Sequence, residues 1–403
     1  MLHRWRLILL VTGLVLLSLF FSSCSQPIKG SLLGVDLSEL EKSELSSFLE
    51  IMEERWLESP LSLKVNDFTI SLSKKELGIS WNIREMKRFI LKGTGETVPI
   101  LFSWKEEKVK SLLDDLAQKT YSLPQDARLE EKRVIPSQEG KELDVEKAIT
   151  ELREALSQGK EEITLTSFQV IKPKIDTSSI LEKLGTSHLL GRYQTSLEEK
   201  DEPTVHNIQK ACSSINGYIL EKGEIFSFNS LVGRAEKEDG YLETHIMVNG
   251  RLSPGYGGGV CQVSSTLYNA LLSTDVQILE RHPHSGYSET TSYVPPGRDA
   301  AVSYGSKDLR FSYPTQKVVI FAYLQEKYLI CEIWGEKENS SQKTWETRII
   351  SLNKKEEEEG LLTVETTVRN GRKIEYRYQD TYIVPWGLGQ KIKEEFQNPT
   401  GGE

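Results

Sequence analysis

The spacing of hydrophobic residues changes along this chain, and its first half alternates between helical and strand-like stretches. Leucine, methionine and tryptophan recur at helical spacing over residues 38–56, and β-type runs at 61–65 and 68–72 meet at Asn66-Asp67, a hairpin signal. A similar order follows, with predicted helices at 109–117 and 145–156, an extended segment at 133–136 and a strand at 162–170. These elements predict one or two small α+β modules over residues 30–182.

The second half differs in composition, because glycines cluster and charged runs become rarer after residue 204. Helical patterns cover 208–215 and 260–273, and the second of these has one apolar face. Strand-like runs follow at 291–294, 300–304, 309–313, 318–324 and 328–334. Asn370-Gly371 then separates two alternating segments, which predicts a hairpin. We therefore expect a multidomain α+β protein with a helix-on-antiparallel-sheet domain over 186–335 and a β-rich tail over 340–390.

The amino-acid composition limits the classes of molecule that we expect this protein to bind. The 403 residues carry a net charge of -9, with 27% charged and 38% hydrophobic residues, which is typical of a folded globular protein. No basic stripe is present that would neutralise phosphates, so we expect no nucleic-acid partner.

The N-terminus predicts export. Arg4 and Arg6 precede an apolar run at 7–21, which is shorter than the roughly 20 residues of a spanning helix. The run ends at Cys24 after small residues, an arrangement that resembles a bacterial lipobox, so residues 1–24 would be a signal peptide with Cys24 lipidated. The alternative is an uncleaved signal anchor. Both interpretations place the protein outside the cytoplasm, held to the outer face of the membrane.

Three further cysteines remain, namely Cys212, Cys261 and Cys331, so an exported chain would keep at least one free thiol or form an intermolecular disulfide. The sequence contains no C-x-x-C pair, and we therefore expect no structural zinc site and no cofactor. Cys212 falls in a predicted helix and Cys331 in a predicted strand, where both would be core residues. Cys261 needs a separate explanation.

Cys261 follows Gly257, Gly258 and Gly259 at the start of a predicted helix. A thiol at a helix N-terminus faces unsatisfied N–H groups and the positive end of the helix dipole, which favour the thiolate. The same N–H groups could hold an oxyanion or a carboxylate. We therefore predict substrate-binding roles for these glycines and for the nearby Gln262 and Ser264, and also for His282 further along the chain.

Two histidines, His282 and His284, and then Asp299 follow downstream, in the order that suits a nucleophile, a base and a residue that orients the base. We predict catalytic roles for Cys261, His284 and Asp299, although the spacing leaves open which histidine acts. This order resembles papain-like and transglutaminase-like enzymes. The alternatives are a non-catalytic ligand pocket, a small buried cysteine, and a metal bound by Cys261 and the histidines.

Five segments resemble the VanW family, which is associated with the cell wall and named for a gene that accompanies glycopeptide resistance. They lie between residues 190 and 385 and read NIQKACSSINGYIL, GEIFSFNSLVGR, GYGGGVCQVSSTLYNALL, ERHPHSGYSETTSYVPPGRDAAVSYGSKDLRF and DTYIVP. The Gly-Gly-Gly-Val-Cys-Gln segment is a highly specific match to this family. The resemblance implies an extracytoplasmic domain and a connection to the glycopeptide response. It implies no particular reaction.

The segments GVDLSELEKSELSSFLEIMEE and GKELDVEKAITELREAL resemble a repeated peptidoglycan-binding module. The alternative is a spacer that separates the following domain from the membrane. Together the two resemblances imply an envelope protein that recognises or remodels peptidoglycan or its peptides. The other readings are a cysteine acyl transferase or amidase acting on wall peptides, and a non-catalytic envelope scaffold.

Overall fold

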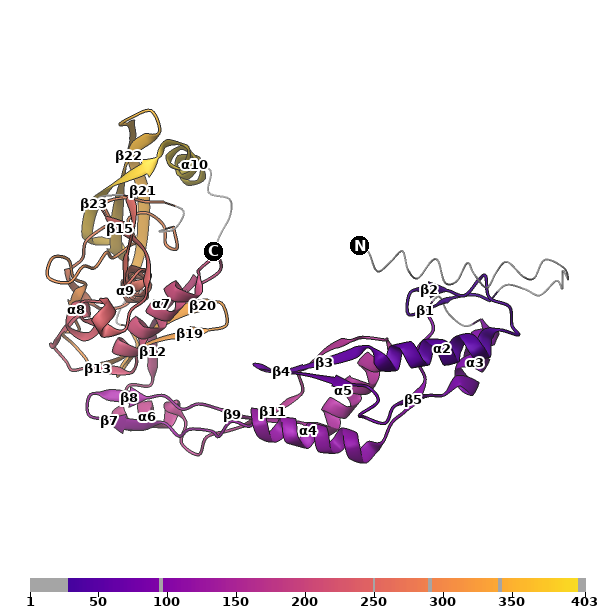
Figure 1. Cartoon of the computed structure of the whole chain (residues 1–403). Helices are drawn as coiled ribbons and strands as arrows, with labels where there is room; N and C mark the ends of the chain where they lie inside the picture. Colours follow the sequence, from indigo (N-terminus) through magenta and orange to yellow (C-terminus); the bar gives the residue numbers. More distant parts are fainter. Residues whose placement is uncertain (1–27, 94–96, 249–250, 289–291, 340–342, 398–403) are drawn as a thin grey trace. The chain divides into compact units, whose positions relative to one another are not determined.

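The computed structural model describes residues 28–93, 97–248, 251–288, 292–339 and 343–397 (Figure 1). The predicted lipobox and Cys24 lie outside these residues. The chain forms two compact units: unit 1 contains the chain up to Leu123 together with Gly140–Ile171, and unit 2 contains Pro124–Glu139 and the chain from Lys172 onward. Helices and small, mostly antiparallel sheets occur in both units, which confirms the predicted α+β class.

Unit 1 is built from short strands and four helices of the described chain that surround one apolar core. Its helices are α2 (Leu45–Glu58), α3 (Ile83–Lys92), α4 (Glu106–Thr120) and α5 (Val145–Ser157). Its strands are β1 (Ser31–Leu32), β2 (Val35–Asp36), β3 (Pro60–Val65), β4 (Phe68–Ser73), β5 (Ser80–Trp81), β6 (Phe102–Ser103), β9 (Gly140–Leu143), β10 (Glu162–Leu165) and β11 (Phe168–Ile171). The predicted hairpin is β3 and β4, and β10 adds to it in parallel.

Two boundaries in unit 1 differ from the prediction. The helix expected from residue 38 begins at Leu45, because Asp36 accepts the Ser38 N–H and the chain turns before the helix starts. The strand expected at 162–170 is interrupted between β10 and β11. There the Glu151 carboxylate accepts hydrogen bonds from the Thr166 N–H and from the hydroxyls of Thr166 and Ser167. Among the described residues, none of the helices is long and apolar enough to cross a membrane.

A six-stranded sheet in the order β12-β20-β19-β13-β8-β7 forms the base of unit 2. Its strands are β7 (Arg128–Glu130), β8 (Arg133–Ile135), β12 (His188–Ser196), β13 (Tyr218–Leu220), β19 (Val318–Gln325) and β20 (Tyr328–Gly335). Helices α7 (Glu202–Ile215) and α9 (Val260–Leu272) pack on it, which confirms the predicted helix-on-sheet arrangement. Cys212 and Cys331 are buried in this core, as predicted.

Smaller elements complete unit 2. They are α6 (Thr177–Leu184), α8 (Phe228–Val232), a 3-10 turn (Lys237–Asp239), a hairpin of β15 (Glu243–Val248) and β16 (Arg251–Tyr256), and a sheet of β14 (Ile225–Ser227), β18 (Arg310–Ser312) and β17 (Gln277–Glu280). The strands predicted at 300–304 and over the described residues 292–294 are wrong, because this stretch is a loop. Ala300 N–H donates to the Ser265 hydroxyl, Ala301 N–H donates to His282 O, and Ser303 forms a single bridge with Lys307, so the stretch pairs with no strand.

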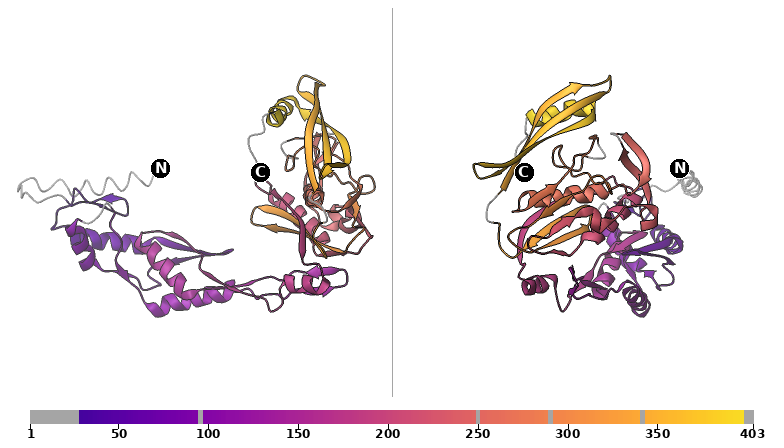
Figure 2. Two further views of the ribbon diagram at one scale, coloured as in Figure 1. Left: turned by 180° about the vertical axis from the view of Figure 1, so that it is seen from behind. Right: turned by 90° about the vertical axis from the view of Figure 1, so that its left-hand side faces the viewer.

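The chain ends in a three-stranded antiparallel sheet, β21 (Lys343–Lys354), β22 (Glu359–Asn370) and β23 (Lys373–Pro385), followed by α10 (Trp386–Gln397). Helix α10 packs against this sheet (Figure 2). The predicted hairpin is confirmed, since Asn370 pairs with Lys373 across the turn and Gly371 has a positive φ of 57°. A bridge between Gly286 and Ile383 ties β23 to the loop that follows β17.

Candidate active site

Helix α9 begins where the sequence predicts, and Cys261 lies in its first turn. Gly257 O accepts the Val260 N–H at 3.1 Å and Gly259 O accepts the Gln262 N–H at 2.9 Å, so the loop carbonyls close the first turn. Gly259 has φ of 99°, a conformation that side chains disfavour. The Gln262 N–H is therefore already bonded, and the Cys261 N–H is the nearer candidate for holding an oxyanion.

The three glycines are required by close packing within the protein. A Cβ on Gly258 would lie 2.0 Å from Thr244 Oγ1 and one on Gly259 would lie 2.7 Å from Ile208 Cγ1, on α7. A Cβ on Gly257 would lie 2.8 Å from Ala235 O. The glycine run lets the loop fit between α7, β15 and the chain near residue 235, and this fixes the position of the helix start.

Cys261 meets His284 at one wall of a cavity. The half-buried Cys261 thiol lies beside the His284 ring, and in its neutral form it donates its one proton to Val302 O at 3.4 Å. The His284 side chain is 7% exposed, and its Nδ1 lies 2.6 Å from Asp299 Oδ2. An ionised carboxylate can only accept, so Nδ1 carries the proton and Nε2 is left for the thiol.

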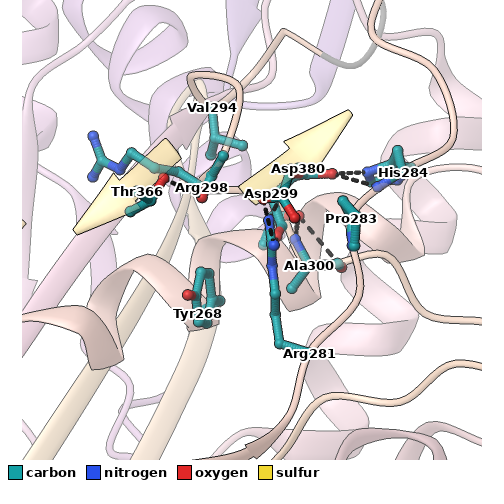
Figure 3. Close-up of polar contacts among 12 residues, drawn as sticks. Tyr268, Arg281, Pro283, His284, Val294, Arg298, Asp299, Ala300, Thr366 and Asp380 are labelled. Carbon is teal, nitrogen blue, oxygen red and sulfur yellow. Dashed lines mark hydrogen bonds and ion pairs between the residues drawn. The ribbon is translucent and has the colours of Figure 1, made fainter. Parts of the chain in front are cut away.

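Asp299 is fully buried and is held on both of its oxygens (Figure 3). Oδ2 accepts from the ring and from the backbone N–H of His284. Oδ1 accepts from Arg281 Nη2 at 2.9 Å and from the Tyr382 hydroxyl at 2.6 Å. Arg281 also donates through Nε to Asp299 O at 2.6 Å and through Nη1 to Asp380 Oδ2 at 2.5 Å. The result is a continuous buried network from Cys261 to Asp380.

The network favours an ion pair between Cys261 and His284. Burial raises the pKa of the Cys261 thiol, but the hydrogen bond with His284 and the charge of that ring outweigh burial, so the net pKa is lowered. Burial lowers the pKa of His284, but the hydrogen bonds and charges of Asp299 and Cys261 raise it by more. The net pKa of His284 is therefore raised to about 10. Burial opposes ionisation of Asp299, but His284 and Arg281 keep its pKa well below the usual range. A thiolate beside an imidazolium is the reactive form of a cysteine nucleophile.

The other histidine lies outside this network. His282 Nε2 lies 3.0 Å from Glu280 Oε1, and the His282 side chain is 38% exposed. It does not line the cavity that contains Cys261 and His284. The structure therefore places His284, and not His282, beside the thiol.

Gln262 and Ser264 are buried in supporting roles. Gln262 Nε2 donates to Thr195 Oγ1 at 3.0 Å and to Ser196 O at 2.9 Å, which ties α9 to the end of β12. The Ser264 hydroxyl donates to Ala300 O at 2.6 Å, which ties α9 to the loop that carries Asp299. Gln262 also lines the cavity, whereas Ser264 does not.

Sequence reasoning missed Arg281, Tyr382 and Asp380. Arg281 is adjacent to the histidine pair, and its proximity could have marked it as a partner for Asp299. Tyr382 and Asp380 follow Asp299 by more than 80 residues, in a segment that reads as an ordinary alternating strand. The alternation does not distinguish them from other strand residues, although the resemblance to the VanW family includes their segment DTYIVP without giving either residue a role.

The cavity has a volume of about 700 Å³ and opens beside Cys261. Its lining is polar and carries both signs of charge, with aromatic groups among them: Glu199, Lys200, Asp201, Arg234, Glu236, Lys307, Tyr256, Tyr293 and Tyr304. Gly257, Gly258 and Gly259 form part of its wall. Over the described residues, no group of three or more histidine, cysteine, aspartate or glutamate side chains is arranged to hold a metal ion.

Comparison with known proteins gives two family matches. The family model described as "VanW like protein" matches residues 204–334, and the one described as "Putative peptidoglycan binding domain" matches residues 70–164. The first match contains Cys261, His284 and Asp299 but ends before β21. No solved structure matches the chain.

Two curated relatives align with the chain. YoaR, an uncharacterized protein of Bacillus subtilis (strain 168), is 37% identical over 208 residues, which are 51% of this chain and 66% of YoaR. The vancomycin B-type resistance protein VanW of Enterococcus faecalis (strain ATCC 700802 / V583) is 32% identical over 140 residues, which are 34% of this chain and 51% of that protein. The chain thus spans less than two thirds of either relative. It is homologous to both, and it contains a VanW-like domain that follows a peptidoglycan-binding-type domain.

Proposed function

We propose that this protein is a cysteine-dependent acyl transferase or amidase that acts on the peptides of peptidoglycan. The observation that carries the proposal is the row Cys261–His284–Asp299, in which Cys261 and His284 line a polar cavity and the buried Asp299 binds the His284 ring. The peptidoglycan-binding-type domain supports cell-wall association, and hence a substrate from the wall. Anchoring to the outer face of the membrane through a lipidated Cys24 is part of the same proposal.

The proposed reaction begins when the Cys261 thiolate attacks an amide carbonyl in the cavity. A C–S bond forms, and the carbonyl oxygen takes up the negative charge next to the Cys261 N–H. Collapse of this intermediate breaks the C–N bond, and the proton on His284 Nε2 passes to the departing amine. The product of this half-reaction is a thioester on Cys261 together with a free amine.

A second nucleophile completes the reaction. Water or an acceptor amine loses a proton to His284 as it attacks the thioester, and the Cys261 thiolate leaves. Water gives hydrolysis, and an amine gives transfer of the acyl group. Asp299 keeps its charge in both steps, because its role is to hold the ring with Nε2 toward the sulfur.

The cavity suits a ligand that carries charges of both signs. Arg234 and Lys307 are cationic, Asp201 and Glu236 are anionic, and all four line the same space. Wall peptides contain carboxylates and amines close together, so both kinds of group would find partners. Tyr256, also in the lining, offers apolar surface for the aliphatic parts.

The test is to incubate the full chain with purified wall peptides and to measure both turnover and the intact protein mass. We expect wild type to show a mass increase located on Cys261 and to release an amine product, and Cys261→Ala to show neither. His284→Ala should lose at least about 100-fold in rate, the size of effect that general base removal produces. The matched control is His188→Ala, which removes an exposed histidine on β12.

A binding protein would give a different result. If wild type and Cys261→Ala bind wall peptides equally and neither releases product nor gains mass, the domain recognises the wall without chemistry. That outcome contradicts the proposed reaction and leaves only the wall association.

A further inference from the structure

The C-terminal sheet holds the loop that carries Asp299. Gly297 N–H donates to Tyr382 Oη at 2.8 Å, and Gly297 O accepts from Tyr378 Oη at 2.9 Å and from Thr366 Oγ1 at 3.2 Å. Both backbone polar groups of this glycine are therefore bonded to side chains of β22 and β23. Because residues around Asp299 form no strand, these bonds take the place of a ladder.

Gly297 allows the close approach. Its φ is 85°, and a Cβ there would lie 2.5 Å from Thr366 Oγ1 and 3.1 Å from Val364 Cγ2 on β22. The loop backbone thus lies directly against the C-terminal sheet. Only a residue without a side chain fits this contact without strain.

Tyr382 connects this backbone contact to the reacting groups. Its hydroxyl accepts from Gly297 N–H and donates to Asp299 Oδ1 at 2.6 Å, so a single oxygen fixes both the loop and the carboxylate. The Tyr382 side chain is fully buried and packs edge-on against Tyr287, with 5.8 Å between ring centroids. Two residues earlier on β23, Asp380 binds Arg281, which in turn binds Asp299.

We propose that Tyr382 and Asp380 are positioning residues for the Cys261–His284–Asp299 set, so that the C-terminal sheet is a part of the catalytic unit. This inference rests on the proposed function only in treating that set as reactive. The sheet lies beyond the 204–334 match, so the inference extends the site past the residues that match the family model, into the strand that carries the DTYIVP segment.

Few titratable and charged groups of the described residues surround the Cys261–His284–Asp299 set. Their charges decide how the reactivity of Cys261 changes with pH. His284 and Arg281 contact Asp299 from the loop after β17, while Tyr382 contacts it directly from β23. Asp380 acts through Arg281, through the Tyr382 hydroxyl at 3.4 Å and through its charge on Asp299, and Cys261 contacts His284 from α9. Two further tyrosines influence the set through their charge, Tyr287 near Asp299 and Tyr293 near both Cys261 and Asp299.

The experiment measures the rate of Cys261 alkylation by iodoacetamide between pH 5 and 10, in the full chain, for wild type and Tyr382→Phe. The substitution removes one oxygen and keeps the ring. Without the Tyr382 hydroxyl, the Asp299 carboxylate and its loop are held less firmly against His284. The imidazolium is then less favoured, and a smaller fraction of Cys261 is present as thiolate. We expect alkylation at pH 6 to slow by about five- to tenfold, the factor associated with one buried hydrogen bond. At pH 10, where Cys261 is ionised in wild type and in the variant, the two alkylation rates should agree.

The matched control is Tyr376→Phe, on the same strand. The Tyr376 hydroxyl is buried and has no hydrogen-bond partner among the described residues, so its removal changes the same chemical group without touching the loop. Its alkylation profile should equal that of wild type. With the chain shown to be folded by urea unfolding, a Tyr382→Phe profile equal to wild type, or one with faster alkylation at pH 6, would overturn the proposal.

A second variant covers the case in which Tyr382→Phe does not fold. Asp380→Asn keeps the size of the side chain and weakens its hold on Arg281, and it should slow alkylation at pH 6 in the same direction. An unchanged profile for a folded Asp380→Asn would also overturn the proposal. Because alkylation needs no wall peptide, the proposed reaction can fail while this positioning role stands. Where turnover is observed, Tyr382→Phe should lower kcat and leave KM unchanged.

Discussion

Asp299 binds His284 twice through one oxygen, since Oδ2 accepts the ring Nδ1–H at 2.6 Å and the backbone N–H at 2.7 Å. The two bonds fix the ring relative to its own backbone as well as relative to the carboxylate. The other ring nitrogen is thereby left facing Cys261. This relationship underlies the first two predictions.

Selective labelling should single out Cys261 among the cysteines of the described chain. Iodoacetamide at pH 6 should modify Cys261 and leave Cys212 and Cys331 untouched, because burial raises the pKa of both core thiols while His284 lowers that of Cys261. An ordinary cysteine with a pKa of about 8.5 would be less than about 1% ionised at pH 6. Peptide mapping after the reaction identifies the modified residue.

Unfolding the same sample in urea before labelling is the control, and all three cysteines should then react alike. Equal and slow modification of the three in the folded protein would show that Cys261 is not activated.

Acid should destabilise unit 2 through Asp299. Its folded pKa lies well below the unfolded value of about 3.9, so between the two values the unfolded chain binds more protons. The stability that Asp299 contributes is therefore complete above about pH 5 and is lost as pH falls toward its folded pKa. We expect this group to lower the free energy of unfolding by up to about 1.4 kcal/mol per pH unit below pH 4.

Urea unfolding of wild type and Asp299→Asn at pH 5, 4 and 3 checks this. The variant should be less stable at pH 5 by about 3 kcal/mol, because Arg281 then keeps only Asp380 as a charged partner. Its stability should decline less steeply with acid. Parallel curves for the two proteins would contradict the assignment.

Gly297→Ala should destabilise the protein by about 2–3 kcal/mol, since the new Cβ requires both a positive φ and a contact of 2.5 Å with Thr366 Oγ1. Alkylation of Cys261 at pH 6 should slow as well. The control is Gly371→Ala in the β22–β23 turn, where φ is 57° but nothing lies within 4 Å, so the cost should stay near 1 kcal/mol. Equal costs at the two positions would mean that the loop moves away from the sheet freely.

Gln262→Met should lower stability and leave affinity for wall peptides within about twofold. The substitution leaves Thr195 Oγ1 and Ser196 O without their donor at a buried site, which costs about 1–3 kcal/mol. Gln209→Met, at an exposed position on α7, is the control and should change the free energy of unfolding by less than about 0.5 kcal/mol. A large loss of affinity without loss of stability would assign Gln262 to ligand binding.

Local patterns in the sequence predicted much of the fold and the centre of the site. The glycine run and the apolar face of 260–273 located the start of α9, and with it Cys261, because both signals act within a few residues. The order of a candidate nucleophile, then histidine, then aspartate led to the prediction of His284 and Asp299. The pattern could not separate His284 from His282, since the choice depends on which ring the loop turns toward α9.

Three features were beyond reach for physical reasons. The run at 300–304 reads as a strand by its apolar residues, but the backbone of Ala300 is bonded to serine side chains of α9 and Ala301 N–H to His282 O, so no ladder forms. The glycines predict backbone positions with positive φ. They do not predict that Thr244 and Ile208 fill the space where a side chain would lie. The contact between Tyr382 and Asp299 joins residues 83 positions apart, and no local period encodes such a pairing.

That sequence separation has a consequence for the order in which the protein is made. Synthesis from the N-terminus produces Cys261, His284 and Asp299 well before β23, so a growing chain holds every reacting side chain while the hydroxyl that fixes the Asp299 loop is still missing. A chain that stops short of residue 382 would contain a thiol with an unsecured partner. Full reactivity would then arrive only with the last strand, and an incomplete product would react more slowly.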